Sequence, residues 1–175
     1  MERFKLTEDC QLRLLEEADA EELYALVASN RAYLAEWMPW AAEQTLERTR
    51  GFIRTARTRH AESNGFEMAM VAGGRIVGAV GLASVDWVAG STSIGYWLDE
   101  GHRGRGLMTR AVQALTDHAF NEMGLHRVQI QVAEENLRSR AIPERLGFEQ
   151  EGLLREAERV GDRYQDLVVY AKLAG

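Results

Sequence analysis

Residues 94–109 read IGYWLDEGHRGRGLMT, and this stretch predicts a strand, a glycine-rich turn and the start of a helix. The part up to Leu98 is rich in apolar and aromatic residues, which favours a strand, and apolar residues recur at helical spacing after Gly106. Between the two lies a glycine-rich turn, where the backbone can approach a ligand closely. The first turn of the next helix leaves N–H groups unpaired at the positive end of its dipole. The stretch therefore predicts an anion site, with phosphate or pyrophosphate as its occupant.

Two common phosphate loops are disfavoured by spacing. A Walker A loop needs Gly-Lys followed by Ser or Thr, and the sequence contains no such tripeptide. A dinucleotide fingerprint needs a third glycine where Thr109 stands, and it opens a βαβ unit, whereas this strand follows a run of hairpins. A turn with a purely structural role is the other interpretation that the glycines alone allow.

The rest of the chain predicts an alternation of helices and strands in one domain, residues 1–175, of class α+β. A glycine pair at Gly73-Gly74 marks a hairpin, and Asp19 is the expected cap of the first helix. The expected strands are Gln11–Leu15, Phe66–Ala72, Arg75–Val85, Ser91–Leu98, Arg127–Val132, Phe148–Leu154 and Tyr164–Leu173. The first expected helix follows Asp19 and carries Leu23, Leu26 and Val27 on one face, and the others cover residues 30–37, 45–62, 107–123 and 136–146.

Composition limits the class of function. The 175 residues are 46% apolar and 27% charged, with a net charge of −6, so nucleic-acid binding is not expected. No run of apolar residues is long enough to span a membrane, and Met1 to Lys5 lead into no secretory signal. The single Cys10 cannot form an internal disulfide, which fits a cytoplasmic protein. No metal is expected, because the four histidines have no ligand spacing: His60, His102, His118 and His126.

Several segments, which follow one another along the chain in the order expected, carry a resemblance to a known family. Arg103-x-x-Gly106-x-Met108 resembles the acetyl-CoA loop of the GNAT superfamily of N-acetyltransferases, whose pattern is Gln/Arg-x-x-Gly-x-Gly/Ala. Met108 departs from the small last residue, but this variant is similar to the RimJ/RimL-type branch that acetylates the N-termini of ribosomal proteins. The other matching segments are residues 30–40, residues 94–98, residues 136–148 with Asn136-x-x-Ser139, and residues 161–166.

The resemblance implies the GNAT fold: a mixed, mostly antiparallel sheet of about seven strands with helices on both faces. Its fourth strand, Ser91–Leu98, and its fifth, Arg127–Val132, are expected to splay apart and hold the pantetheine arm of acetyl-CoA. Trp97 and Leu98 would pair with that arm through their backbone, and Asn136 and Ser139 would contact the arm or its thiol end. The implied pyrophosphate-binding residues are Arg103, Gly104, Arg105, Gly106, Leu107, Met108 and Thr109.

The resemblance also implies the catalytic groups. Glu158 matches the position of the base proposed for ribosomal N-terminal serine acetylases, although a solvated hairpin charge is the other interpretation and Glu156 lies close by. Many GNAT enzymes protonate the leaving thiolate with a tyrosine, but Pro143 stands where that tyrosine would align. Ser139 is the replacement candidate, and it is equally typical of a simple helix start. Pro143 should also loosen the helix at Ser139.

The acceptor is expected beside Tyr33, Trp37 and Trp40, which the resemblance places on the acceptor side, although clustered aromatics are also typical of a core. The leading hypothesis is direct acetylation of a protein N-terminal α-amine, as in a ribosomal protein. The alternatives are acetylation of a small amine such as a polyamine or an aminoglycoside, and a CoA-binding sensor without turnover. A homodimer is expected only from the family.

Overall fold

The computed structural model describes residues 3–175. Met1 and Glu2, which begin the segment in which no secretory signal is expected, lie outside the described residues. The strands are β1 (Arg3–Lys5), β2 (Cys10–Leu14), β3 (Phe66–Ala72), β4 (Arg75–Asp86), β5 (Ser91–Leu98), β6 (Arg127–Ala133), β7 (Glu149–Val160) and β8 (Arg163–Leu173). The helices are α1 (Ala20–Ser29), α2 (Arg31–Leu34), α3 (Leu46–Ala61), α4 (Leu107–Asn121) and α5 (Leu137–Arg145), with short 3₁₀ turns at Glu17–Asp19 and Glu100–His102.

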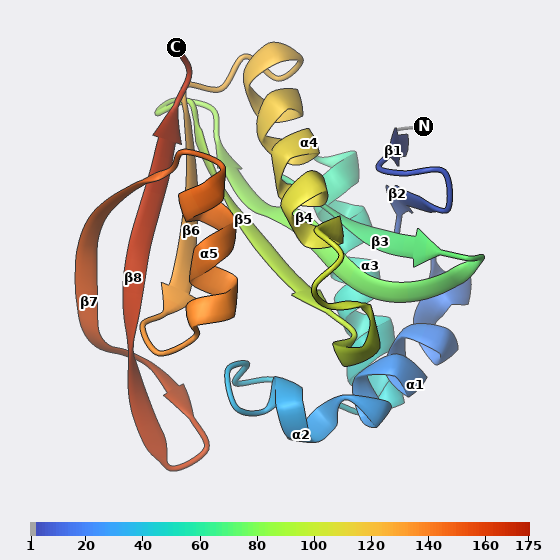
Figure 1. The fold of residues 1–175 in the computed structure, drawn as a ribbon. Coiled ribbons are helices and arrows are strands. Elements are labelled where there is room, and N and C mark those ends of the chain that lie inside the picture. The colour runs from blue at the N-terminus through green and yellow to red at the C-terminus, as the bar shows by residue number, and fades with distance from the viewer. Residues whose placement is uncertain (1–2) are drawn as a thin grey trace.

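The strands form one sheet in the order β1-β2-β3-β4-β5-β6-β8-β7, and β5 and β6 form its one parallel pair among the described strands (Figure 1). Helices α4 and α5 cover one face of the sheet, and α1 and α3 cover the other. Successive side chains of β3 point to opposite faces of the sheet. Met68 packs in the core under α4, and Ala69 packs in the core with α1 and α3. The expected mixed sheet with helices on both faces is confirmed.

The sheet opens between β5 and β6. Only Ser91, Thr92 and Ser93 of β5 pair with β6, whereas the whole of β6 continues to pair with β8. From Ile94 to Leu98, β5 pairs only with β4 on its other side. Figure 1 shows the two strands diverging from their shared end. The expected splay is confirmed, and it leaves an edge of backbone N–H and C=O groups without strand partners.

Several boundaries differ from the sequence-based expectations. The sheet has eight strands, because the three residues of β1 pair with β2, and so short a strand carries no detectable alternation. Only Arg31–Leu34 is α-helical within the expected helix over residues 30–37. The expected strand Phe148–Leu154 is too short, since β7 runs to Val160 across a bulge at Glu156, whose φ is 48°. Its exposed polar residues hid this continuation.

Asp19 stands at the N-cap position of α1, where the sequence predicted a helix cap. Asp19 precedes α1, but its side chain makes no cap hydrogen bond to that helix. Its carboxylate instead accepts two hydrogen bonds of 2.7 Å from Arg13 and one of 2.8 Å from the N–H of Glu16. Thr45, in contrast, caps α3 by accepting from the N–H of Arg48 at 3.2 Å. Within residues 3–175, no helix is long and apolar enough to cross a membrane.

Candidate active site

A cavity of 490 Å³, the cleft, opens where β5 and β6 diverge. Its walls come from these two strands, the start of α5, the β7–β8 hairpin and the segment between α2 and α3. The cleft brings together six of the residues predicted for the site: Trp37, Trp40, Trp97, Asn136, Ser139 and Glu158. These residues lie up to 121 positions apart in sequence, from 37 to 158, so the fold assembles them.

The glycine turn has the backbone that an anion site requires. Gly104 and Gly106 have φ of 76° and 70°, in the left-handed region that favours glycine, and a Cβ at either would meet nothing within 4 Å. The first hydrogen bond of α4 runs from the N–H of Arg110 to the carbonyl of Gly106 at 3.1 Å. The N–H groups of Leu107 to Thr109 therefore have no acceptor within the helix. Met108 is buried in the core, so its long side chain points away from these groups.

Arg103 and Tyr33 lie together beside this turn. The guanidinium of Arg103 stacks 4.0 Å from the centre of the Tyr33 ring and forms an ion pair with Glu100. Tyr33 is not among the residues that line the cleft, so its predicted contact with the acceptor gains no support from this position. Trp37 and Trp40 do line the cleft, and the Trp40 ring lies 6.1 Å from that of Trp97.

A polar network that sequence reasoning missed holds the turn to α2. Asn30, which is buried, donates to Asp99 at 2.8 Å and accepts from the N–H of Glu100 at 2.9 Å. Asp99 also bonds the ring Nδ1 of His102 at 2.7 Å. Burial opposes the ionisation of Asp99, but its hydrogen bonds from His102 and Asn30 outweigh that and lower its pKa. The carboxylate thus fixes where the glycine turn begins.

Asn136, Ser139 and Tyr96 form the wall of the cleft at α5. Asn136 caps the helix, because its side-chain oxygen accepts from the N–H of Ser139 at 3.2 Å. The Ser139 hydroxyl donates to the Tyr96 hydroxyl at 3.2 Å, and Tyr96 in turn donates to the Ser139 carbonyl at 3.0 Å. Burial raises the pKa of Tyr96, so this hydroxyl stays protonated and can donate. A tyrosine is therefore present at Ser139, but it comes from β5 and not from α5.

Glu158 faces the cleft from β7. Its carboxylate accepts a hydrogen bond of 2.6 Å from Gln165, its direct partner on β8, which also donates to the carbonyl of Trp37 at 3.1 Å. The neighbouring candidate, Glu156, is exposed at the bulge, and its N–H donates to Asp166 at 2.7 Å. The geometry therefore separates the two acids, since Glu158 lines the cleft and Glu156 does not.

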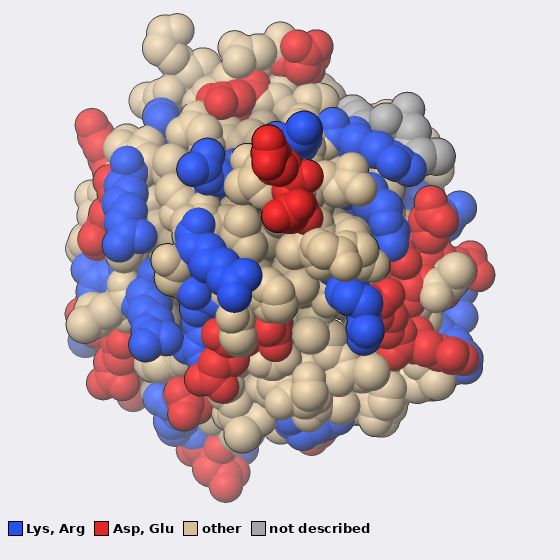
Figure 2. All heavy atoms as spheres, turned by 45° about the vertical axis from the view of Figure 1, so that its right-hand side comes forward, with Lys and Arg blue, Asp and Glu red and all other residues tan. Residues whose placement is uncertain are grey.

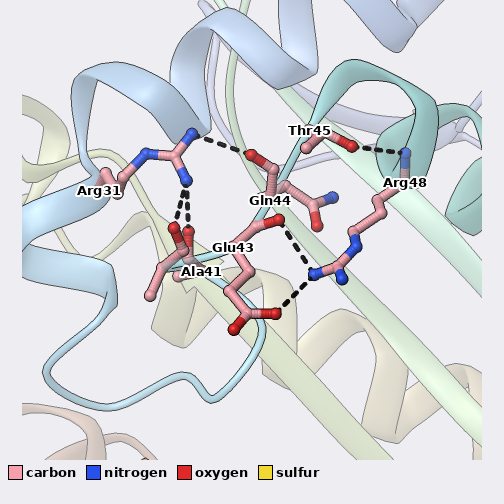
Figure 3. Close-up of polar contacts among 7 residues, drawn as sticks. Arg31, Ala41, Glu43, Gln44, Thr45 and Arg48 are labelled. Atoms are coloured by element: carbon pink, nitrogen blue, oxygen red, sulfur yellow. Dashed lines mark hydrogen bonds and ion pairs between the residues drawn. The ribbon is translucent and has the colours of Figure 1, made fainter. Parts of the chain in front are cut away.

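The segment that carries Trp37 and Trp40 is held by hydrogen bonds at its C-terminal end, residues 41–44. Arg31 on α2 donates to the carbonyls of Ala41, Ala42 and Gln44 at 3.0, 2.7 and 3.0 Å, respectively (Figure 3). Arg48 on α3 holds Glu43 through its carbonyl at 3.0 Å and its carboxylate at 3.1 Å. These contacts fix the aromatic wall of the cleft against α3. Sequence reasoning had no signal for them, because both arginines resemble ordinary surface charges.

Glu67 on β3 is a further residue of the cleft that sequence reasoning missed. Its carboxylate pairs with Arg59 on α3 at 3.2 Å. Burial raises the pKa of Glu67 to about 7, although the charge of Arg59 acts in the opposite direction. The available signal was one acid in the otherwise apolar strand FEMAMVA, residues 66–72. Among residues 3–175, no group of His, Cys, Asp and Glu is arranged to hold a metal ion.

Comparison with known proteins decides the family. Residues 10–149 match the family described as acetyltransferase (GNAT) domain. The chain belongs to the GNAT family. A Bacillus subtilis GNAT protein named putative ribosomal N-acetyltransferase YdaF is 36% identical over 97% of this chain and 93% of its own. The ribosomal-protein-serine acetyltransferase of Escherichia coli is 29% identical over 98% of this chain and 97% of its own.

Solved GNAT structures agree with this assignment. RimL, a ribosomal alpha-N-protein acetyltransferase in complex with coenzyme A, superposes with a TM-score of 0.94 at 26% identity, covering 98% of each chain. The microcin C7 self-immunity acetyltransferase MccE, in complex with acetyl-CoA and AMP, gives a TM-score of 0.90 at 26% identity, over 97% of this chain and 95% of its own. The chain is a GNAT N-acetyltransferase that uses acetyl-CoA and resembles the RimJ/RimL-type enzymes.

The cleft of this GNAT chain and the turn beside it fit acetyl-CoA in two respects. The edge of β5 from Ile94 to Leu98 lacks a strand partner on the side of the cleft, so it can pair with the amides of a pantetheine arm. The N–H groups at the start of α4 suit a pyrophosphate. On the face that Figure 2 presents, Lys and Arg side chains are interspersed with Asp and Glu side chains.

Proposed function

We propose that this enzyme acetylates the N-terminal α-amine of a protein, such as a ribosomal protein, by direct transfer from acetyl-CoA. The observation that carries the proposal is the position of Glu158, which lines the cleft together with Trp37 and Trp40. The names of relatives that modify ribosomal proteins support the class of acceptor. Acetyl-CoA supplies the acetyl group as an activated thioester.

The backbone of the glycine turn and of β5 would hold the cosubstrate. The N–H groups of residues 103–109 are proposed to bind the pyrophosphate, with Arg105 adding positive charge. Arg103 is the most engaged of these residues, because its N–H donates to the carbonyl of Glu100 at 3.4 Å and its guanidinium contacts Glu100 and Tyr33. The edge at Trp97 and Leu98 would pair with the pantetheine amides.

Glu158 is proposed to take the proton from the amine, directly or through water. An α-amine has a reference pKa of about 8 against about 10.4 for lysine, so it needs less assistance to become the neutral nucleophile. The hydrogen bond from Gln165 fixes one oxygen of Glu158 and the carbonyl of Trp37 fixes Gln165 in turn. The base is thereby held next to the aromatic wall where the acceptor would lie.

Ser139 is proposed to protonate the leaving thiolate. Ser139 lines the cleft, and its hydroxyl donates to the Tyr96 hydroxyl. When Ser139 gives its proton to the sulfur, the Tyr96 O–H would turn from the Ser139 carbonyl, to which it donates at 3.0 Å, toward the serine oxygen, and solvent would then restore the serine proton. Asn136 holds the backbone of Ser139 from the N-cap of α5. Tyr96 therefore acts through Ser139 as a positioning residue.

The proposal is tested by following free-thiol release from acetyl-CoA with a panel of acceptors. Peptides with a free N-terminus should support release, whereas the same peptides with a blocked N-terminus, polyamines and aminoglycosides should not. Release with small amines alone would favour the small-amine enzyme, a class to which a relative named spermidine N(1)-acetyltransferase, 26% identical over 89% of this chain, belongs. Saturable CoA binding without release from any acceptor would favour a sensor.

A further inference from the structure

Glu67 is an acid that the steps above leave without a role. It stands on the face of β3 that carries Ala69 and packs with α1 and α3, and its side chain is only 15% exposed. It nevertheless lines the same cleft as Glu158, Gly95 and Trp97. A carboxylate in such a place costs stability unless a partner compensates it. A ligand group in the cleft is one such partner.

Three residues in one row across the sheet connect Glu67 to the splayed part of β5. Glu67 on β3 pairs with Gly81 on β4, and Gly81 pairs with Gly95 on β5. Both positions beyond Glu67 in this row are glycines, so neither β4 nor β5 contributes a side chain in the row between the acid and the open edge of β5. The row forms a shallow trough in the sheet, and Gly95 forms its end in the cleft.

The side chain of Glu67 occupies this trough. A Cβ added to Gly81 would lie 2.4 Å from Oε2 of Glu67, so the carboxylate extends over Gly81 toward β5. A Cβ added to Gly95 would meet nothing within 4 Å, so the trough is open beyond the carboxylate. Neighbouring strands lie about 4.8 Å apart, which places the carboxylate roughly one strand spacing from the backbone of Gly95.

Arg59 holds the other side of the carboxylate. Its guanidinium pairs with Oε1 of Glu67 at 3.2 Å and also donates to the carbonyl of Ala83. Glu67 is thus held from the α3 side by one oxygen, while Oε2 is directed over Gly81. The raised pKa of Glu67 agrees with a carboxylate that its surroundings in the protein compensate only in part.

We propose that Glu67 is an acceptor-binding residue that receives a hydrogen-bond-donating side chain, hydroxyl or ammonium, from the acceptor residue that carries the reacting amine. This inference rests on the proposed function. The reacting amine must enter the cleft that Gly95 and Glu158 line, and Glu67 lies about one strand spacing from Gly95. In a peptide, the first side chain is the group attached within a few bonds of that nitrogen.

Such a site discriminates against an acceptor whose first side chain has no donor group, because the Glu67 carboxylate is then left without a hydrogen-bond partner. An apolar side chain in the trough would bury Oε2 unpaired, and a site built to bond a donor rejects the analogue that lacks it. The enzyme should therefore prefer serine over alanine and lysine over norleucine at the first position. These pairs differ mainly in the donor group, so they isolate the effect of Glu67.

The test measures kcat/KM on four peptides that differ only in the first residue: serine, alanine, lysine and norleucine. The full-length enzyme should favour the donor-bearing member of each pair by about tenfold or more, as expected for a hydrogen bond to a charged group. In Glu67→Met both ratios should fall toward one, with the Kd for CoA unchanged. Arg59→Met/Glu67→Met serves as a second variant, because it leaves no buried guanidinium without a partner.

Two further variants sharpen the result. Glu67→Gln keeps the shape and an acceptor oxygen but removes the charge, so it should lose the lysine preference and retain part of the serine preference. Glu151→Gln removes an acid from an arginine pair on the exposed part of β7, and it should leave all ratios unchanged. Acetylation of all four peptides with ratios that ignore Glu67 overturns this inference alone. Failure to acetylate any peptide overturns the proposed function as well.

Discussion

The Tyr96 hydroxyl donates a hydrogen bond of 3.0 Å to the carbonyl oxygen of Ser139, the acceptor that Pro143 leaves without a helical partner. Proline has no N–H to donate to the residue four positions earlier. α5 nevertheless continues through Pro143 to Arg145, so the expected loosening does not interrupt the helix. A side chain from β5 thus satisfies a backbone carbonyl of α5 at the wall of the cleft.

Tyr96→Phe should lower both stability and turnover. Removing the hydroxyl leaves the Ser139 carbonyl unsatisfied, at a cost of about 1–3 kcal/mol in the free energy of unfolding. Tyr96→Phe/Pro143→Ala should regain most of that stability, since alanine supplies the missing N–H, while the low kcat persists. Tyr164→Phe, on the exposed end of β8, is the matched control. Denaturant unfolding and thiol-release kinetics on the same variants separate the two effects; recovery of kcat in the double variant would contradict a role for Tyr96 in catalysis.

Glu158→Gln should lower kcat about 10²- to 10⁴-fold, because a positioned base contributes a factor of that size. The Kd for CoA should stay the same, since Glu158 lies on β7, away from the glycine turn. Glu156→Gln changes the same type of residue at the exposed bulge and should leave kcat unaltered. If the two variants behave alike, or if Glu158→Gln weakens CoA binding as much as turnover, the assignment of the base is wrong.

Gly106→Val should abolish tight CoA binding. Gly106 has a φ of 70°, which a β-branched residue adopts only with strain, so the backbone must leave the geometry that presents the N–H groups of α4. Gly124→Val is the control, since Gly124 has a φ of 68° at the other end of α4. Both variants should lose stability, but only Gly106→Val should raise the Kd for CoA in calorimetry. Normal CoA binding by Gly106→Val would contradict the phosphate site.

Glu67 should make stability depend on pH in a defined direction. Burial raises its pKa from 4.5 to about 7 in the folded protein, so the folded state binds this proton more tightly than the unfolded state. Its contribution to stability is full below pH 4.5 and is lost as the pH rises through 7. The free energy of unfolding of Glu67→Gln relative to the original protein should therefore increase between pH 5 and pH 8, on the order of 3 kcal/mol. Unfolding curves at the two pH values give this difference; a constant difference would mean that Glu67 does not titrate there.

The parts of the site that are local in sequence could be predicted, and those that depend on distant contacts could not. The glycine turn and its helix are set by neighbouring residues, and the resemblance supplied the splay between β5 and β6. Tyr96 was missed because its partner is 43 positions away, although strand alternation places it on the same face as Ile94 and Leu98. Glu67 was missed because its access to the cleft depends on Gly81 and Gly95, which lie on two other strands.

The end of β7 shows the same limit in the fold. Nothing in residues 155–160 alternates in hydrophobicity, and the strand there is held by pairing with β8 on the far side of a bulge. The role proposed for Glu158 depends on that pairing, since the register places Glu158 opposite Gln165. The local hydrophobicity pattern therefore does not predict the strand in which Glu158, the proposed base, lies.

The central claim is most directly tested by locating the acetyl group on a single peptide. The peptide carries a free N-terminus and one internal lysine, and it is incubated with the enzyme and acetyl-CoA before tandem mass spectrometry. An acetyl group on the α-nitrogen, absent when Glu158→Gln replaces the enzyme over the same time, is the predicted result. Acetylation of the lysine side chain, or of neither nitrogen while polyamines are modified, would contradict the account.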